Sequence, residues 1–278
     1  MRGARFRRVV LRRPDLRKPF PERFAERLRG QTVRALTRRG KYLLAELSSR
    51  EILLIHLGMT GSFRGVINDA RDPHDHVVFE MSSGAVIAFN DPRRFGVMDL
   101  VAGGAAEQHA VLGRMGPEPL SAGFDGTALA KACAGKRVAL KLALLDQRVV
   151  AGLGNIYASE ALHLAHLSPR QRASSIASRG GAPRDSAHRL AAAIKVVLAR
   201  AIERQSRPAY RQSRFRVYDR EGQPCPTRRC GGSIVRFTQG GRSTFYCPTC
   251  QRSSARSRGS ARARARRARS GWRPTATR

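Results

Sequence analysis

The chain has 278 residues and sets 53 Lys and Arg against 20 Asp and Glu, which gives a formal net charge of +33. A surplus of this size favours a polyanionic partner, with nucleic acid as the first choice and an anionic membrane surface as the second. The composition argues against a membrane-spanning protein, because no stretch approaches the roughly 20 apolar residues of a spanning helix.

The chain opens with MRGARFRRVVLRRPDLRKPF, which is rich in arginine but is not followed by an apolar run of signal-peptide length. A secretory signal is therefore not expected, and a mitochondrial transit peptide would carry more serine and a clearer amphipathic period. The β-branched run FRRVVLRR instead predicts a strand.

Short apolar or alternating runs dominate the first hundred residues and predict strands. These runs are KYLLAEL, EILLIHLGM, HVVFEM and AVIAF, and the turn residues of SSREI and MSSGAV separate two pairs of them. This spacing predicts an antiparallel sandwich or barrel-like domain.

After GPEPL the apolar residues follow a helical period, which predicts a helical domain. The segments are DGTALAKACAG, ALKLALLDQ, NIYASEALHLA and SAHRLAAAIKVVLARAIERQ. In the last segment the apolar stripe runs through Leu190, Ile194, Val197, Leu198 and Ala201. The isolated Cys133 is expected to be a small buried apolar side chain.

Two glycines precede Asn155 in LLDQRVVAGLGNIYASEAL, where Asn155 is placed as the N-cap of a helix that runs on from Ile156. Gly152 and Gly154 would let the backbone come close to a partner, and amide groups at a helix start favour a phosphate. Ordinary capping explains the motif in isolation, whereas the basic charge and the cysteines described next favour phosphate binding.

Strands are predicted again in FRVYD, SIVRF and STFYC, around four of the five cysteines. Cys225 and Cys230 are spaced C-x4-C, Cys247 and Cys250 are spaced C-x2-C, and sixteen residues with a Gly-Gly turn separate the pairs. Four thiolates at these spacings can hold one tetrahedral Zn²⁺ and close a hairpin too small to fold alone. Such a shell leaves no open position for water, so a structural zinc is expected. Paired cysteines without a secretion signal also indicate a reducing cytoplasm.

The segment 253–278 contains nine Arg and no Asp or Glu. It cannot bury a core and is expected to be disordered. It is either a dispensable extension or a tether to phosphates that raises salt-dependent affinity.

HLGMTGSF and NDPRRFG place Met59, Arg93 and Phe95 in turns. A flexible apolar side chain, an arginine and an aromatic at loop tips are suited to wedge a duplex open and to occupy the space of an extruded base. Alternatively, Met59 and Phe95 belong to the core and Asp91 pairs with Arg94. The residue types alone do not separate these interpretations.

Six motifs in order, GKYLL, HLGMTGSF, PHDHVVFE, NDPRRFG, LLDQRVVAGLGNIYASEAL and GGRSTFYCPTCQ, together resemble the bacterial formamidopyrimidine-DNA glycosylase family. The resemblance covers residue 3 to about Arg252. The related endonuclease VIII branch, which acts on oxidised pyrimidines, shares the helix-two-turn-helix and the zinc hairpin but generally lacks the DPRRFG pattern.

The resemblance implies a multidomain α+β fold. Its expected parts are an antiparallel β-sandwich over residues 1–104, a helix-two-turn-helix DNA-binding domain over 105–209, a four-cysteine zinc finger over 215–252 and the Arg-rich tail over 253–278. The implied function is base-excision repair, in which a DNA glycosylase removes 8-oxoguanine and formamidopyrimidines from damaged double-stranded DNA and its AP lyase activity cleaves the strand by β,δ-elimination. A monomer in the bacterial cytoplasm, associated with the nucleoid, is expected.

The resemblance also assigns site residues. Lys41 would contact a phosphate in the catalytic pocket and donate a proton in β-elimination, and Arg242 is assigned to δ-elimination. Because an arginine does not readily give up its proton, we expect Arg242 to act mainly by gripping phosphate. The implied DNA-binding residues are His74, Arg93, Lys136, Lys141, Asn155, Met59 and Phe95. The implied zinc ligands are Cys225, Cys230, Cys247 and Cys250.

Three features depart from the family pattern. The family begins with a nucleophilic proline followed by a glutamate, and a terminal amine suits this role because its pKa lies near roughly 8. RGARFRRVV resembles the strand after that opening helix, so both residues are expected upstream of Met1. The loop SRPAYRQSR is shorter than the family's base-covering loop, which bears on the preference for 8-oxoguanine. The C-x4-C pair is wider than the usual C-x2-C.

The departures leave alternatives open. The start codon is assigned too late, or the chain is a truncated DNA-binding or lesion-binding protein without catalysis. Residual lyase action through Lys41 would require burial beside other cations to lower its pKa. A zinc-ribbon ribosomal or RNA-binding protein also fits the charge and the cysteines, but it does not account for DPRRFG and the helical phosphate motif together.

Overall fold

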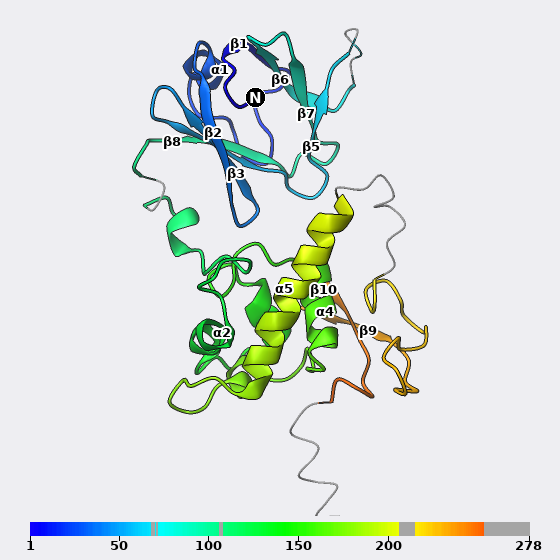
Figure 1. Cartoon of the computed structure of the whole chain (residues 1–278). Helices are drawn as coiled ribbons and strands as arrows, with labels where there is room; N and C mark the ends of the chain where they lie inside the picture. Colours follow the sequence, from blue (N-terminus) through cyan, green and yellow to red (C-terminus); the bar gives the residue numbers. More distant parts are fainter. Residues whose placement is uncertain (68–69, 71, 106–107, 206–214, 253–278) are drawn as a thin grey trace, which may run out of the picture. The chain divides into compact units, whose positions relative to one another are not determined.

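The computed structural model describes residues 1–67, 70, 72–105, 108–205 and 215–252 (Figure 1). It divides into two compact units, Met1–Met115 and Gly116–Arg278. The predicted tail over 253–278 and the loop SRPAYRQSR lie outside the described residues.

Two four-stranded antiparallel sheets form most of the first unit. One sheet has the order β1 (Phe6–Leu11), β6 (Asp75–Met81), β7 (Val86–Asn90) and β5 (Ser62–Gly65). The other has the order β2 (Val33–Arg39), β3 (Tyr42–Leu47), β4 (Ile52–His56) and β8 (Val97–Val101). The strands predicted from FRRVVLRR, KYLLAEL, EILLIHLGM, HVVFEM and AVIAF are confirmed.

The two sheets share one hydrophobic core, so the first unit is a sandwich. Phe6, Phe79 and Phe89 from one sheet belong to the same buried cluster as Leu47 and Ile55 from the other. The short helix α1 (Phe24–Leu28) adds Phe24 and Leu28 to this cluster. Apolar side chains at alternate strand positions thus meet between the sheets, as the period-2 pattern requires.

Helices form most of the second unit, as the helical period predicted. They are α2 (Gly126–Cys133), α3 (Leu140–Leu145), α4 (Asn155–Leu164), the short 3-10 helix η2 (Ala173–Ile176) and α5 (Asp185–Gln205). α5 packs against α2 and α4. Leu190, Ile194 and Val197 of its predicted stripe are buried in the core of the second unit, and Leu198 is partly buried against that core. Ala201 of the same stripe is also buried. Cys133 is buried in that core as well, and burial raises the pKa of its thiol to about 11.

A β-hairpin of β9 (Val235–Gln239) and β10 (Arg242–Tyr246) packs against α4 through β10. The prediction of a strand in FRVYD was wrong, because Phe215–Asp219 forms bends and turns. The buried Glu160 carboxylate of α4 accepts hydrogen bonds from the amide groups of Arg216, Val217 and Tyr218 at 2.8 to 3.0 Å. Those amides cannot pair with a neighbouring strand, so the segment turns around the carboxylate.

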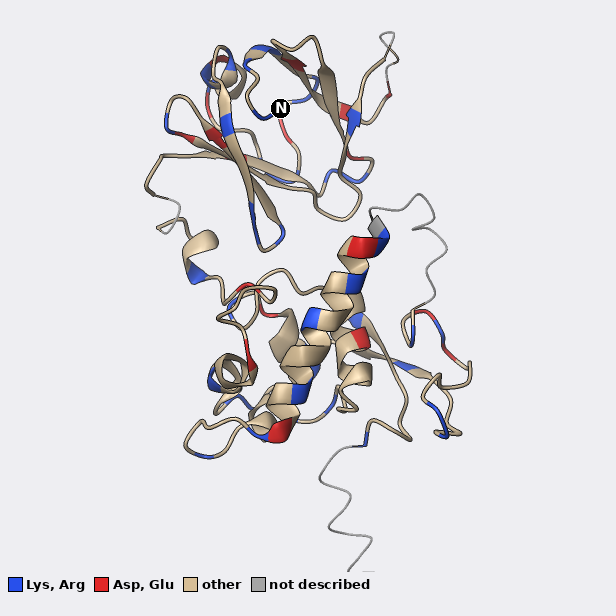
Figure 2. Cartoon of the chain, viewed as in Figure 1, with Lys and Arg blue, Asp and Glu red and all other residues tan. Residues whose placement is uncertain are grey.

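The arrangement within each unit confirms the α+β class. No helix in the described part of the chain is long and apolar enough to cross a membrane. Lys and Arg outnumber Asp and Glu in the chain, and the same holds within α5 (Figure 2).

Candidate functional site

Met59, Arg93 and Phe95 lie on two neighbouring loops of the first unit. Met59 is 71% exposed and Phe95 is 39% exposed, so neither is a core residue. The Arg93 guanidinium carbon lies 4.7 Å from the centroid of the Phe95 ring, within cation–π range. The loops thus present a thioether, a guanidinium and an aromatic ring together.

Glycine packing holds these two loops against one another. Gly58 has a φ of +69°, and a Cβ at this position would lie 2.5 Å from the Phe95 carbonyl carbon. Any other residue would therefore clash with backbone and strain the turn. The backbone before Met59 consequently rests directly on the backbone of Phe95.

Asp91 is the buried polar centre of the same loops. Its carboxylate accepts hydrogen bonds from the Thr60 hydroxyl at 2.6 Å and from the Gly96 amide at 2.7 Å. Thr60 Oγ1 also accepts from the Arg93 amide at 3.3 Å. Among the described residues the Arg94 guanidinium forms its ion pair with Asp15 at 3.8 Å and not with the Asp91 carboxylate, whereas the Arg94 amide donates to the Asp91 carbonyl at 3.1 Å. One carboxylate therefore connects the Met59 loop to the Arg93–Phe95 loop.

His74 is exposed on a third loop, which is attached to the same centre. The Asp91 amide donates to the His74 carbonyl at 3.0 Å, and His76 Nε2 donates to the Asp91 carbonyl at 2.9 Å. Beside His74, the buried Asp75 accepts from the Arg64 guanidinium and from Asn90 Nδ2. Burial opposes the charge of Asp75, but these bonds hold the pKa of its carboxyl below the usual range.

Lys41 lies in the turn between β2 and β3 and is exposed. Its charge contributes to the environment of His56, whose pKa is lowered by burial first and then by Lys41 and Arg17. Residual lyase action through Lys41 would require this side chain to be buried, whereas Lys41 is exposed in this structure.

In the second unit, Lys141 is completely buried in α3. Its ammonium donates to Thr244 Oγ1 at 2.7 Å and to the Ser243 carbonyl at 3.0 Å. Burial and the nearby Arg242 lower the pKa of Lys141 to about 8. This position differs from the expectation that Lys141 lies at a DNA strand: the side chain anchors the hairpin instead.

Asn155 is the first residue of α4 rather than its N-cap, which is Gly154. The correction has a clear cause, since Asn155 Nδ2 donates across to the Ser243 carbonyl at 3.0 Å and is also within 3.5 Å of the Tyr218 hydroxyl. Its Oδ1 is buried and has no hydrogen-bond partner among the described residues. The backbone amides in the first turn of α4 nonetheless have no carbonyl acceptor within the helix and point out from its start.

Arg242 is exposed at the start of β10, directly after the turn. Gly240 and Gly241 have φ values of +57° and +70°, which a two-residue hairpin turn favours. A Cβ at Gly240 would lie 2.7 Å from Leu142 Cδ2, so this glycine lets the turn approach α3. Lys136 is half-buried in the loop before α3.

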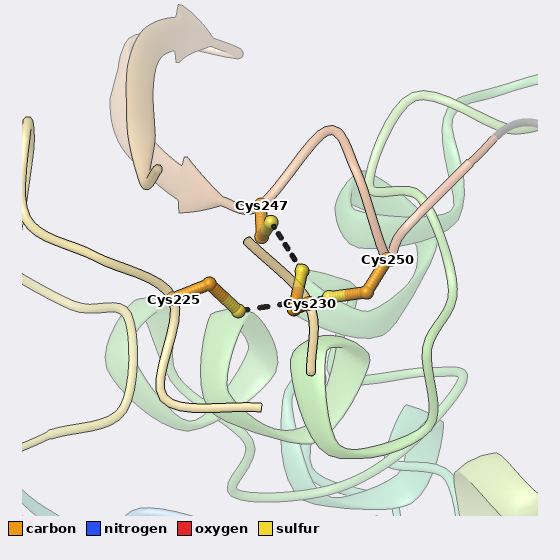
Figure 3. A group of neighbouring side chains, drawn as sticks. All are labelled: Cys225, Cys230, Cys247 and Cys250. Carbon is orange, nitrogen blue, oxygen red and sulfur yellow. Dashed lines mark hydrogen bonds between the residues drawn. The ribbon is translucent and has the colours of Figure 1, made fainter. Parts of the chain in front are cut away.

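The four cysteines form a compact cluster (Figure 3). All four sulfur atoms lie within 4.8 Å of one another, with Cys225 to Cys250 at 3.8 Å and Cys230 to Cys247 at 3.5 Å. A tetrahedral Zn²⁺ with bonds of about 2.3 Å requires sulfurs about 3.8 Å apart. The donor set and its dimensions therefore fit one structural zinc ion.

Three segments of the chain match models of known protein families. Residues 1–98 match the formamidopyrimidine-DNA glycosylase N-terminal domain, residues 115–211 match the formamidopyrimidine-DNA glycosylase H2TH domain, and residues 222–252 match the zinc finger found in FPG and IleRS. This combination defines a glycosylase-type protein with an H2TH domain and a zinc finger. The chain belongs to the formamidopyrimidine-DNA glycosylase family.

Individual relatives support the assignment over most of the chain. The formamidopyrimidine-DNA glycosylase of Bradyrhizobium sp. strain BTAi1 is 54% identical over 276 residues, with 91% of this chain and 94% of the relative covered. The MutM (Fpg) structure from Thermus thermophilus is 37% identical with a TM-score of 0.77. The Lactococcus lactis enzyme bound to DNA containing an AP site is 30% identical with a TM-score of 0.80. Both structures cover 91% of this chain, which covers 94% of each.

Sequence reasoning missed the buried polar residues that orient the loops. They are Asp75, Glu160 and His163, together with Asp91, which sequence reasoning considered only as a partner of Arg94. Their only signal was a charged or polar residue inside an apolar run or beside a turn, which does not specify a partner distant in sequence.

Proposed function

We propose that this protein is a base-excision repair enzyme that removes oxidised purines, 8-oxoguanine and formamidopyrimidines, from damaged double-stranded DNA and cleaves the abasic strand by β,δ-elimination. The observation that carries the proposal is the exposed group of Met59, Arg93 and Phe95 held on a buried polar centre. Solved relatives are described as bound to DNA containing an AP site, carbocyclic 8-oxo-G or FAPY-dG, which supports the same substrate class.

In the first unit, Met59, Arg93 and Phe95 fill the gap left by an extruded nucleotide. The Met59 side chain is already exposed, so it breaks few protein contacts when it enters a base stack. The Arg93 guanidinium lies over the Phe95 ring and offers hydrogen bonds to the unpaired base opposite. His74 and Lys41 are exposed donors that bind the phosphate backbone, and Lys41 donates the proton in β-elimination.

In the second unit, Lys136, Asn155 and Arg242 bind the phosphate backbone. The start of α4 supplies amide groups and the positive end of a helix dipole. Arg242 grips phosphate during δ-elimination and remains protonated throughout. Lys141 does not contact DNA in this proposal; its buried ammonium holds the hairpin that carries Arg242.

One Zn²⁺ held by Cys225, Cys230, Cys247 and Cys250 has a structural role in this scheme. Four thiolates complete the metal's coordination, so bound zinc fixes the finger and contributes no water-activating position. We retain the division into residues 1–104, 105–209, 215–252 and 253–278. We also propose that the protein works as a monomer on the nucleoid in the bacterial cytoplasm.

The test is an excision assay with protein expressed from its own gene and that gene's native upstream sequence. The substrates are matched duplexes that carry 8-oxoguanine, an oxidised pyrimidine or no lesion. We expect cleavage of the 8-oxoguanine duplex with phosphate left at both ends of the gap. Binding without cleavage would favour a non-catalytic DNA-binding protein, and preferential cleavage at the pyrimidine would favour an endonuclease VIII-like activity.

A further inference from the structure

A buried histidine contacts the zinc finger from outside its four cysteines. His163 lies in the C-terminal half of α4 with no exposed surface. Its Nε2 lies 3.4 Å from the Cys225 sulfur and 3.3 Å from the Thr227 hydroxyl. A fully buried imidazole needs hydrogen-bond partners. Two partners near Nε2 are the expected zinc ligand Cys225 and Thr227, which lies between Cys225 and Cys230 in the sequence.

The opposite side of the ring determines which nitrogen carries the hydrogen. Arg216 Nε donates to His163 Nδ1 at 3.4 Å. An arginine can only donate, so Nδ1 accepts and the hydrogen of the neutral ring is on Nε2. Nε2–H therefore points at the Cys225 sulfur and the Thr227 oxygen as a donor.

Thr227 extends this contact to a second sulfur. The Cys250 sulfur lies 3.9 Å from Thr227 Oγ1. When Cys250 is a zinc-bound thiolate it can only accept, and the Thr227 hydroxyl then donates to it. Thr227 belongs to CPTRRC, so the wide C-x4-C spacing places a hydroxyl beside the metal site.

We propose that His163 and Thr227 are positioning residues of the zinc centre, donating hydrogen bonds to the thiolates of Cys225 and Cys250 without binding the metal themselves. His163 is not part of the described group of ligand atoms that lie within 4.8 Å of one another, which contains only the four sulfurs. Zinc with four thiolates carries a net charge of about −2, and donors to sulfur disperse that charge. The proposal does not depend on the proposed activity toward DNA.

The contact also ties the finger to the helix whose first residue is Asn155. Asn155 binds the β10 backbone at one end of α4, and His163 binds the zinc ligand Cys225 at the other. The finger is therefore attached near both ends of α4, about two turns apart, in addition to the hydrogen bonds that Glu160 accepts between them.

Metal retention and a spectrum test the proposal without any activity measurement. Zinc release to the chelator 4-(2-pyridylazo)resorcinol is measured for the full chain and for His163→Phe, which keeps an aromatic ring but has no donor. Loss of an outer hydrogen bond to a metal ligand commonly weakens metal binding about 10- to 100-fold, so we expect release at least about tenfold faster. His163→Gln, whose amide can donate from a similar place, restores most of the retention.

The second readout uses Co²⁺ in place of zinc. Hydrogen bonds stabilise the sulfur lone pairs, so their loss in His163→Phe moves the thiolate-to-cobalt charge-transfer band to longer wavelength. Thr227→Val gives a smaller shift in the same direction, and Thr227→Ser gives none. The exposed neighbour His166 provides the control variant His166→Gln, which leaves both readouts unchanged.

Two results would overturn the proposal. One is zinc release and a cobalt spectrum in folded His163→Phe equal to those of the parent chain. The other is a parent cobalt spectrum showing three sulfurs and one nitrogen, which would make His163 a ligand. If His163→Phe fails to fold by circular dichroism, the partly exposed Thr227 pair decides between the outcomes.

Discussion

Replacing Asp91 by alanine should disconnect the loops that carry Met59, Arg93 and Phe95. The carboxylate accepts from Thr60 at 2.6 Å and from Gly96 at 2.7 Å. A hydrogen bond to a charged group contributes about 1.5 to 3 kcal/mol, so losing both costs about 3 to 6 kcal/mol locally. If only about 1.4 kcal/mol of that cost must be recovered when the loops bind DNA, the affinity for DNA falls tenfold.

The assay is fluorescence anisotropy with a duplex that contains an abasic-site analogue, compared with the same duplex undamaged. We expect at least about tenfold weaker binding of the abasic duplex and a smaller change for undamaged DNA, whose phosphates are bound by other residues as well. Asp91→Asn should retain much of the affinity, because the Thr60 hydroxyl can reverse its role and accept from the new amide.

The matched control is Asp15→Asn, which removes the partly buried carboxylate that lies 3.8 Å from the Arg94 guanidinium and should leave affinity unchanged. Folded Asp91→Ala protein with the parent's preference for the abasic duplex would refute the reasoning, because the loops would then be ordered without their shared acceptor.

Three further predictions concern the second unit. The ¹³Cε resonance of Lys141, which is identified by its loss in Lys141→Met, should titrate near pH 8. Because the folded pKa lies below the ordinary value, the unfolding free energy of the parent relative to Lys141→Met should rise by about 3 kcal/mol as pH increases from 8 to 10.5. Titration near pH 10.5 would contradict the burial argument. Glu160→Gln replaces one of two oxygens that receive three amides, so thermal unfolding should report about 2 kcal/mol lower stability, whereas an unchanged melting temperature would show that the carboxylate is dispensable. Removal of zinc by a chelator should abolish hydrogen-exchange protection in β9 and β10, and persistent protection there would show that the hairpin folds without metal.

Elements with a regular apolar period were predictable from sequence. The stripe from Leu190 to Ala201 identified α5, because burial along one helix face leaves a period that the residues alone reveal. FRVYD has the composition of a strand yet forms turns, because its amides bind Glu160, which lies more than fifty residues earlier. No local pattern carries that information.

The zinc ligands were predictable for a similar reason, since cysteine spacing is itself local. The orientation of polar site residues was not. Asn155 has the residue type and position of an N-cap, but its amide donates to Ser243 in the distant hairpin. Lys141 has the residue type of a surface cation, and only the structure shows that the same hairpin covers it.

The Ser243 carbonyl accepts from both Lys141 and Asn155. The group that joins two helices to the hairpin is thus part of the main chain, and every amino acid provides it. Residue 243 should consequently tolerate drift during evolution, while positions 141 and 155 should not. A sequence survey would then find a variable residue at the structural centre of this junction, with its importance visible only through its invariant partners.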